Sequence, residues 1–263
     1  MEDLHVTLIQ TKLFWEEKEK NLEHFRNLIS GIREQTDLIL LPETFNTGFS
    51  INPKRCAEET EGPSMNFLKQ IAKERDTAVC ATLLIWESDK CVNRLVFYYP
   101  DGHYAMYDKR HLFRLSEEYR IFRGGTAKTL IKLKGWKLSP MICYDLRFPV
   151  WSKNTLTNGE YEYDLLFFLA NWPEVRSHAW KALLVARAIE NLAYVIGVNR
   201  AGEDGNGMDH TGDSMVVNPK GILLFQAPER AEAVQTVTLN YEELTLFRES
   251  VAFGLDWDQF TIH

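Results

Sequence analysis

Three polar side chains in the sequence together suit nucleophilic catalysis, namely Glu43, Lys109 and Cys143. Each stands at the end of an apolar segment, where a rigid element could hold it at the edge of a sheet. A free thiol has a pKa of about 8.5 and is mostly protonated at neutral pH, so a cysteine nucleophile needs a base or a lowered pKa. A carboxylate can accept that proton, and an ammonium can stabilise both a thiolate and an oxyanion. The set is chemically coherent if the fold brings it into one cleft.

Taken singly, each of these residues also fits an ordinary structural role. Most free cysteines are small buried hydrophobes, and a charged residue after a strand is usually solvated or a cap. His111 and His178 are the alternative partners for Cys143, but neither carries an orienting signature. Arg147 follows Cys143 too closely for a phosphate cradle of the C-x5-R kind, and no H-E-x-x-H or Walker motif occurs.

The segment around Cys143 predicts a strand, a sharp turn and a helix. Residues 138–142 are mainly apolar, polar residues follow Cys143 at once, and Pro149 suits the start of a helix. A thiol at this turn would lie near the positive end of a helix dipole, which favours the thiolate. The backbone N–H of Tyr144, the next residue, is a natural oxyanion donor.

Further apolar runs and amphipathic segments predict the elements that must position these residues. Strands are expected at 4–10, 37–41, 78–85, 92–99, 103–107, 129–133, 136–143, 164–170, 194–198, 214–218, 222–227 and 234–239. Helices are expected at 15–33, 64–75 and 177–192, long loops at 109–126 and 202–212, and a mixed tail from 241. Many strands with helices on both sides imply a layered α/β fold.

Composition narrows the class of protein. The chain has 263 residues, of which 45% are hydrophobic, and a formal net charge of -7, so a duplex nucleic-acid binder is disfavoured. The N-terminus is acidic rather than signal-like, and no apolar run approaches the ~18 residues of a membrane span. The four cysteines form no C-x-x-C pair, so we expect free thiols, no metal site and a cytoplasmic protein.

Three separated motifs, together with further blocks, resemble the nitrilase, or carbon–nitrogen hydrolase, superfamily. The motifs are Leu41-Pro42-Glu43, Tyr107-Asp108-Lys109-Arg110-His111-Leu112-Phe113 and Ile142-Cys143-Tyr144-Asp145-Leu146-Arg147-Phe148-Pro149. The blocks are Asn171-Trp172, Ala186-Arg187-Ala188-Ile189-Glu190-Asn191, Gly212-Asp213-Ser214 and Asn218-Pro219-Lys220-Gly221. The second and third motifs are most similar to the ω-amidase branch, which includes bacterial enzymes acting on 2-oxoglutaramate.

The resemblance implies a four-layer α-β-β-α sandwich in which two mixed sheets pack face to face with helices outside. Residues 1–263 would form a single domain. Members usually pair through helices around the nucleophile and region 178–192, so a homodimer is expected. The tail, 241–263, would then cover the partner; the alternative is that it folds back on its own chain.

The resemblance also implies the residue roles. Glu43 would be the general base, Lys109 the oxyanion stabiliser and Cys143 the nucleophile. A second glutamate would position the substrate amide. Glu117 and Glu118 are both candidates, and Glu118 is preferred by its spacing from Gly124-Gly125. No metal or organic cofactor is implied.

The pocket walls and the cation for a substrate carboxylate are less sharply indicated. Phe49, Phe113, Trp172 and Tyr144 are expected at the substrate, with Phe45 as a further candidate. Arg147 is expected to hold the turn by pairing with a carboxylate, and the alternative is that it binds the substrate. The loop after Lys109 could supply the cation, from Arg110, Arg114, Arg120 or Arg123, although a solvated loop is equally consistent with these residues.

The implied function is hydrolysis of a small primary amide through a Cys143 thioester. The expected substrate is a dicarboxylate monoamide cleaved at the distal amide, with 2-oxoglutaramate as the first compound to test. A nitrilase or an N-carbamoyl hydrolase with the same triad is the alternative within the family. A catalytically silent interaction module is the alternative outside enzyme function.

Overall fold

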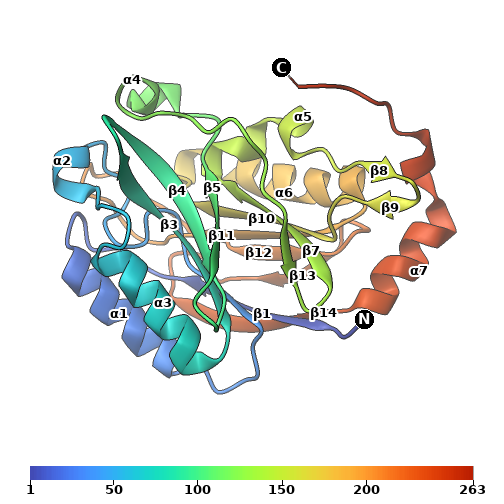
Figure 1. The fold of residues 1–263 in the computed structure, drawn as a ribbon, viewed down its shortest axis with the longest axis horizontal. Helices are drawn as coiled ribbons and strands as arrows, with labels where there is room; N and C mark the ends of the chain where they lie inside the picture. The colour runs from blue at the N-terminus through green and yellow to red at the C-terminus, as the bar shows by residue number, and fades with distance from the viewer. Residues whose placement is uncertain (263) are drawn as a thin grey trace.

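Two six-stranded sheets pack face to face in the computed structural model, which describes residues 1–262 (Figure 1). The first sheet has the order β14-β1-β2-β3-β4-β5, and the second has the order β13-β12-β11-β10-β7-β6. The first contains β1 (Leu4–Gln10), β2 (Leu38–Leu40), β3 (Ala78–Glu87), β4 (Lys90–Tyr98), β5 (Tyr104–Asp108) and β14 (Ala233–Leu239). The second contains β6 (Ile131–Leu133), β7 (Trp136–Ile142), β10 (Leu165–Ala170), β11 (Tyr194–Asn199), β12 (Met215–Val217) and β13 (Leu223–Gln226).

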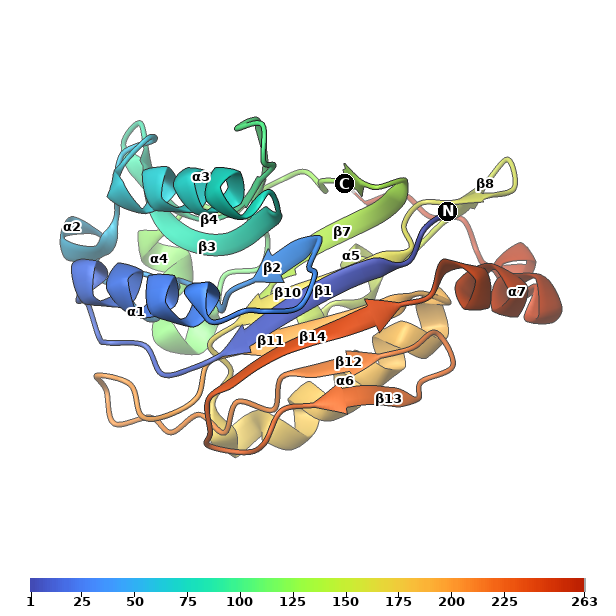
Figure 2. The same ribbon diagram turned by 90° about the horizontal axis from the view of Figure 1, so that it is seen from below.

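Helices cover the outer face of each sheet. Helices α1 (Lys18–Ser30) and α3 (Pro63–Arg75) lie against the first sheet, and α6 (Ser177–Asn191) lies against the second (Figure 2). On α6, Trp180 and Leu184 pack so closely on β11 that a Cβ at Gly197 would clash with both. The predicted four-layer α-β-β-α sandwich is therefore confirmed.

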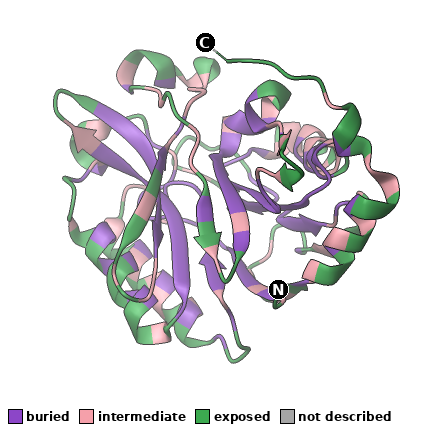
Figure 3. Ribbon diagram, turned by 45° about the vertical axis from the view of Figure 1, so that its right-hand side comes forward, coloured by how far each residue is buried: buried purple, intermediate pink, exposed green. Residues whose placement is uncertain are grey.

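The continuous apolar run of β2 reflects burial on both of its faces. Leu38 and Leu40 join the core between the two sheets, whereas Ile39 points the other way and packs among residues of α1 and α3. Side chains alternate across a strand, so only a strand covered on both sides needs such a run. Figure 3 shows the result, with buried strands between helices whose outer faces are exposed.

Parallel pairing brings the ends of the key strands together. Strands β1, β2 and β3 are parallel neighbours in the first sheet, and β7, β10 and β11 are parallel neighbours in the second. Strand β5 runs parallel to β3 because each pairs antiparallel with β4. The segments that follow β2, β5, β7 and β10 therefore leave the sandwich at its carboxyl edges.

Several short elements were not predicted. The expected loop 109–126 contains a 3₁₀ helix, Arg114–Ser116, and helix α4, Glu118–Ile121. Helix α2 (Pro53–Cys56) and the small hairpin of β8 (Leu156–Thr157) and β9 (Glu160–Tyr161) were also missed, whereas helix α5 (Pro149–Ser152) begins at Pro149 as expected. Elements of two to four residues are too short to show a hydrophobic period.

The tail begins with helix α7, Tyr241–Val251, which packs on its own chain. Asn240 caps it by accepting a hydrogen bond from Glu243 N at 2.7 Å. Arg248 is buried and donates to Asp164 Oδ1 at 2.6 Å and to the Leu192 carbonyl at 2.8 Å. The first part of the tail thus packs on its own chain, while Phe253 and Leu255 remain exposed. No helix within residues 1–262 is long and apolar enough to cross a membrane.

Candidate active site

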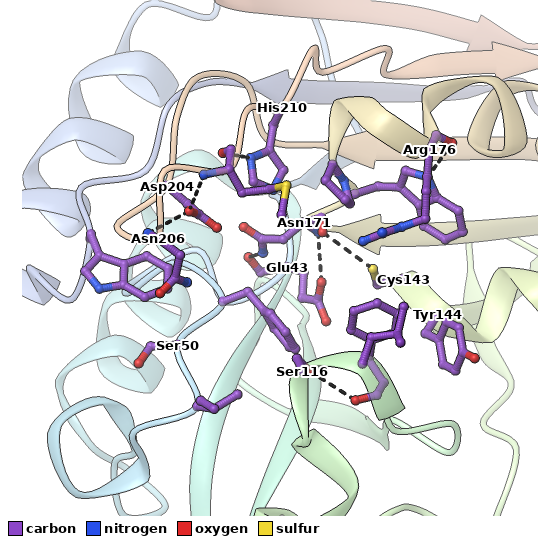
Figure 4. Close-up of a pocket in the computed structure, with 18 of the residues that line it drawn as sticks. Glu43, Ser50, Ser116, Cys143, Tyr144, Asn171, Arg176, Asp204, Asn206 and His210 are labelled. Atoms are coloured by element: carbon purple, nitrogen blue, oxygen red, sulfur yellow. Dashed lines mark hydrogen bonds between the residues drawn. The ribbon is translucent and has the colours of Figure 1, made fainter.

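A cavity of about 540 Å³ opens where the strand ends of the two sheets meet (Figure 4). Glu43, Lys109 and Cys143 all line it, so the fold brings together the three residues that the sequence singled out. All three side chains are buried. The volume suits a small organic molecule.

Cys143 stands at a strained turn directly after β7. Its φ of 42° lies in the left-handed region, which a non-glycine residue adopts only when its surroundings enforce it. Asp145 is fully buried and accepts hydrogen bonds from Ile142 N at 3.1 Å and from Tyr107 Oη at 2.7 Å. Arg187 of α6 donates to the Leu146 carbonyl at 2.7 Å. These buried bonds hold the turn in place.

The thiolate prediction for Cys143 is wrong. The strand is followed by a 3₁₀ helix, Cys143–Arg147, and then by the single turn of α5, so the expected helix dipole is short. Burial raises the pKa of Cys143 well above its usual value, the charge of Glu43 raises it further, and the nearby Lys109 does not offset them. Cys143 therefore rests as a neutral thiol and needs a base at the moment of attack.

The Glu43 carboxylate is fixed by three donors. Its Oε1 accepts from Asn93 Nδ2 and from Lys109 Nζ, each at 2.9 Å. Its Oε2 accepts from Asn171 N at 2.8 Å, and the Asn171 carbonyl lies 3.9 Å from Cys143 Sγ. Sequence reasoning gave Asn93 and Asn171 no role in the site. A lone asparagine inside the buried strand β4 was the available signal for Asn93.

Lys109 lies between two carboxylates. Its Nζ is 2.9 Å from Glu43 Oε1 and 3.1 Å from Glu118 Oε2. Burial alone would lower the pKa of Lys109, but the charges of Glu118 and Glu43 outweigh it and raise the pKa. Lys109 therefore stays an ammonium, and its Nζ lies 4.9 Å from the centre of the Phe49 ring.

The geometry separates the two adjacent glutamates. Glu118 is fully buried behind Lys109 and accepts from Phe113 N at 2.6 Å. Burial raises the pKa of Glu118, although Lys109 acts in the opposite direction. Glu117 points outward and pairs with Arg120 at 2.7 Å. Glu118 contacts Lys109 and does not line the cavity itself.

The predicted aromatic residues lie mostly at the cavity. Phe49, Phe113, Tyr144 and Trp172 all line it. Phe45 does not, because its ring packs in the core between Phe25 and Phe67. The walls also include Trp15, Glu16, Ser50, Arg176, Asp204, Asn206, Met208 and His210, which sequence reasoning did not assign. Most of these come from segments 15–16 and 204–210. The first was expected to begin a helix, which in the structure starts only at Lys18, and the second was expected to be a loop.

The arginines are placed differently from the prediction. Arg110, Arg114, Arg120 and Arg123 are all absent from the cavity wall. Arg120 pairs with Glu117, and Arg110 lies over the ring of Trp151. Arg147 was expected to pair with a carboxylate. Instead it lines the cavity, without an ion pair to any residue in the described chain, and lies 4.8 Å from the centre of the Trp172 ring.

Comparison with known proteins places this geometry in a family. The profile of the carbon-nitrogen hydrolase family matches residues 5–249. The chain belongs to the carbon-nitrogen hydrolase family. The two packed mixed sheets with helices outside fit this membership.

Individual relatives cover all or nearly all of this carbon-nitrogen hydrolase. The omega-amidase YafV of Yersinia enterocolitica is 39% identical over 263 residues, with 100% of both chains covered. The 2-oxoglutaramate amidase of Bacillus subtilis (strain 168) is 28% identical over 249 residues, with 94% of both covered. The crystal structure of a CN-hydrolase superfamily protein from Xanthomonas campestris, which has an arsenic adduct in its active site, gives a TM-score of 0.97 at 37% identity, with 100% of both chains covered.

Proposed function

We propose that this carbon-nitrogen hydrolase is an ω-amidase, which cleaves the distal primary amide of a small dicarboxylate monoamide. One observation carries the proposal. A buried thiol, a fixed carboxylate and a buried ammonium line one small cavity. The full-length similarity to proteins named omega-amidase and 2-oxoglutaramate amidase supports the substrate class, with 2-oxoglutaramate as the first compound to test.

Acylation begins when Cys143 Sγ attacks the amide carbon and its proton passes to Glu43. The oxygen of the tetrahedral intermediate is then stabilised by Lys109 Nζ and by the N–H of Tyr144. Collapse breaks the carbon–nitrogen bond, Glu43 returns the proton to the leaving nitrogen, and ammonia departs. The acyl group remains on Cys143 as a thioester.

Water then completes the cycle. Glu43 takes a proton from the water that attacks the thioester carbon, and Cys143 leaves as the sulfur regains a proton. Glu118 serves as a positioning residue, because its carboxylate contacts the Lys109 ammonium that Glu43 also contacts. Asn93 and Asn171 have the corresponding task for Glu43, since both donate to its carboxylate.

A substrate panel tests this function. Ammonia release is measured with 2-oxoglutaramate, an aliphatic nitrile and an N-carbamoyl amino acid, and we expect turnover of the amide. Cys143→Ala should reduce that rate by at least about 1,000-fold because the covalent route is lost, while its circular dichroism stays that of the parent. Preferred turnover of the nitrile or carbamoyl compound would replace the proposal, and no turnover of any compound would favour a silent interaction module.

The chain is proposed to act as one domain, residues 1–263, in a homodimer within the cytoplasm. The dimer is supported by apolar side chains that remain exposed near α6 and in the tail, including Ile189, Ile222, Phe253 and Leu255. The location is supported by the cysteines, Cys56, Cys80, Cys91 and Cys143, which are all free thiols.

A further inference from the structure

Two arginines on the cavity wall lack a carboxylate partner. Arg147 follows the nucleophile turn and Arg176 precedes α6. Neither forms an ion pair within residues 1–262, whereas the more deeply buried Arg94, Arg187 and Arg248 do. The buried Arg200 also lacks an ion pair, but it donates hydrogen bonds to the Ala201 and Glu203 carbonyls. By contrast, the side chains of Arg147 and Arg176 donate no hydrogen bond to the described part of the chain. Two half-buried cations without an acceptor in the same cavity require an explanation.

Aromatic rings hold both guanidinium groups from their faces. Arg147 lies 4.8 Å from the centre of the Trp172 ring, and Arg176 lies 5.2 Å from the centre of the Phe113 ring. The Trp172 ring is itself fixed, since its Nε1 donates to the Arg176 carbonyl at 2.8 Å. A guanidinium stacked on a ring keeps its in-plane N–H donors free. These are the donors that bind a carboxylate.

The two arginines are close enough to repel each other. Burial lowers the pKa of Arg176, and the positive charge of Arg147 lowers it further. The neutral thiol of Cys143 does not relieve this repulsion. An anion placed between the guanidinium groups would be attracted to both and would reduce their mutual repulsion.

The charges of the cavity are distributed unevenly. Asp204 and Asn206 lie across the cavity from Cys143, Tyr144 and Arg176 (Figure 4). Glu16 also lines the cavity and pairs with Arg55 at 2.9 Å. An anionic group would therefore be repelled from the side with Asp204 and attracted to the side with Arg176. The cavity has one favourable place for a carboxylate, and it is next to the nucleophile.

We propose that Arg147 and Arg176 form the subsite for the free carboxylate of the substrate and thereby select an acid amide over a neutral one. This inference rests on the proposed amidase function and deepens it. With the carboxylate on the two arginines, a short carbon chain carries the amide to Cys143 Sγ. The loop arginines after Lys109 are not required.

The test compares glutaramate with pentanamide, in which a methyl group replaces the carboxylate. We expect the wild-type protein to prefer glutaramate in kcat/KM by at least about 100-fold, and Arg176→Gln to reduce that preference at least about 10-fold, mainly through KM. Arg147→Gln should act similarly, and the double variant should nearly abolish the preference. Arg120→Gln, at an exposed arginine outside the cavity, is the matched control and should keep it.

A binding experiment separates this subsite from the proposed function. Glutaramate binding is measured by calorimetry on Cys143→Ala protein with and without Arg176→Gln, and Arg176→Lys should recover part of the lost affinity. If the wild type hydrolyses no amide but the arginine variants weaken glutaramate binding, the proposed function fails and the subsite stands. If the double variant keeps both the preference for glutaramate over pentanamide and the affinity for glutaramate, the subsite is refuted.

Discussion

At the scale of single residues, the protonation of Cys143 depends on the charge of Glu43. Burial and the charge of Glu43 both raise the pKa of the Cys143 thiol, so the proposed mechanism requires Glu43 to take its proton during the attack on the amide. Lys109 belongs to the same unit, because its ammonium contacts Glu43 and Glu118 at once. The charge of Lys109 is therefore available to an oxyanion in every catalytic cycle.

Lys109→Arg should decrease kcat by at least about 100-fold, the effect of losing one oxyanion donor. The planar guanidinium is larger than an ammonium and cannot fit between Glu43 and Glu118 without displacing one of them. Ammonia release at saturating 2-oxoglutaramate measures the change. Lys137→Arg, at a lysine on β7 outside the cavity, is the matched control. A rate within a few-fold of the parent would show that Lys109 is not the oxyanion donor.

At the scale of elements, the segment that closes the cavity opposite Cys143 depends on a neutral histidine. His210 is buried, and its Nδ1 donates to the Met208 carbonyl at 2.9 Å. Burial lowers the pKa of His210 to about 4, with a further decrease from the charge of Arg200, and Asp204 opposes both. Protonation of His210 would place a second cation beside Arg200.

The depressed pKa of His210 predicts lower stability in acid. The unfolded chain gains this proton near pH 6.5 and the folded chain near pH 4, so the stabilisation is complete above pH 6.5 and decreases as the pH falls. By pH 4 the loss should reach about 3 kcal/mol. The free energy of unfolding, measured with urea between pH 7 and 4, should therefore depend less on pH in His210→Gln than in the parent protein. His103→Gln, at an exposed turn, should keep the parent slope, and an unchanged slope in His210→Gln would contradict the prediction.

The sequence predicted those strands and helices that are long enough for their burial to appear as a hydrophobic pattern. The strands that precede Glu43, Lys109 and Cys143 were expected because each is an apolar run. Their meeting depends on two different sheets packing face to face, which the sequence does not show. Asn93 was missed because a buried polar residue reveals its partner only in three dimensions. Arg176 was missed because the residues before α6 resemble any polar loop. The protonation state of Cys143 was wrong because local sequence cannot show the depth of burial or the proximity of Glu43.

At the scale of the whole molecule, exposed apolar residues predict a homodimer. Light scattering should give twice the mass of one chain, and Ile189→Asp in α6 should shift the protein towards the monomer because it places a charge in the contact. Met106→Asp, at an equally exposed position on β5, is the matched control and should leave the mass unchanged. A parent protein that is monomeric at micromolar concentration would refute the assembly.

The pair of glutamates around Lys109 also bears on how the enzyme empties its cavity. The substrate amide arrives uncharged beside Glu43, but hydrolysis turns it into a carboxylate at the same place. One ammonium then faces three carboxylates, so the product is repelled by the residues that helped to form it. Turnover therefore creates its own driving force for product dissociation, and accumulated dicarboxylate should slow the enzyme only weakly.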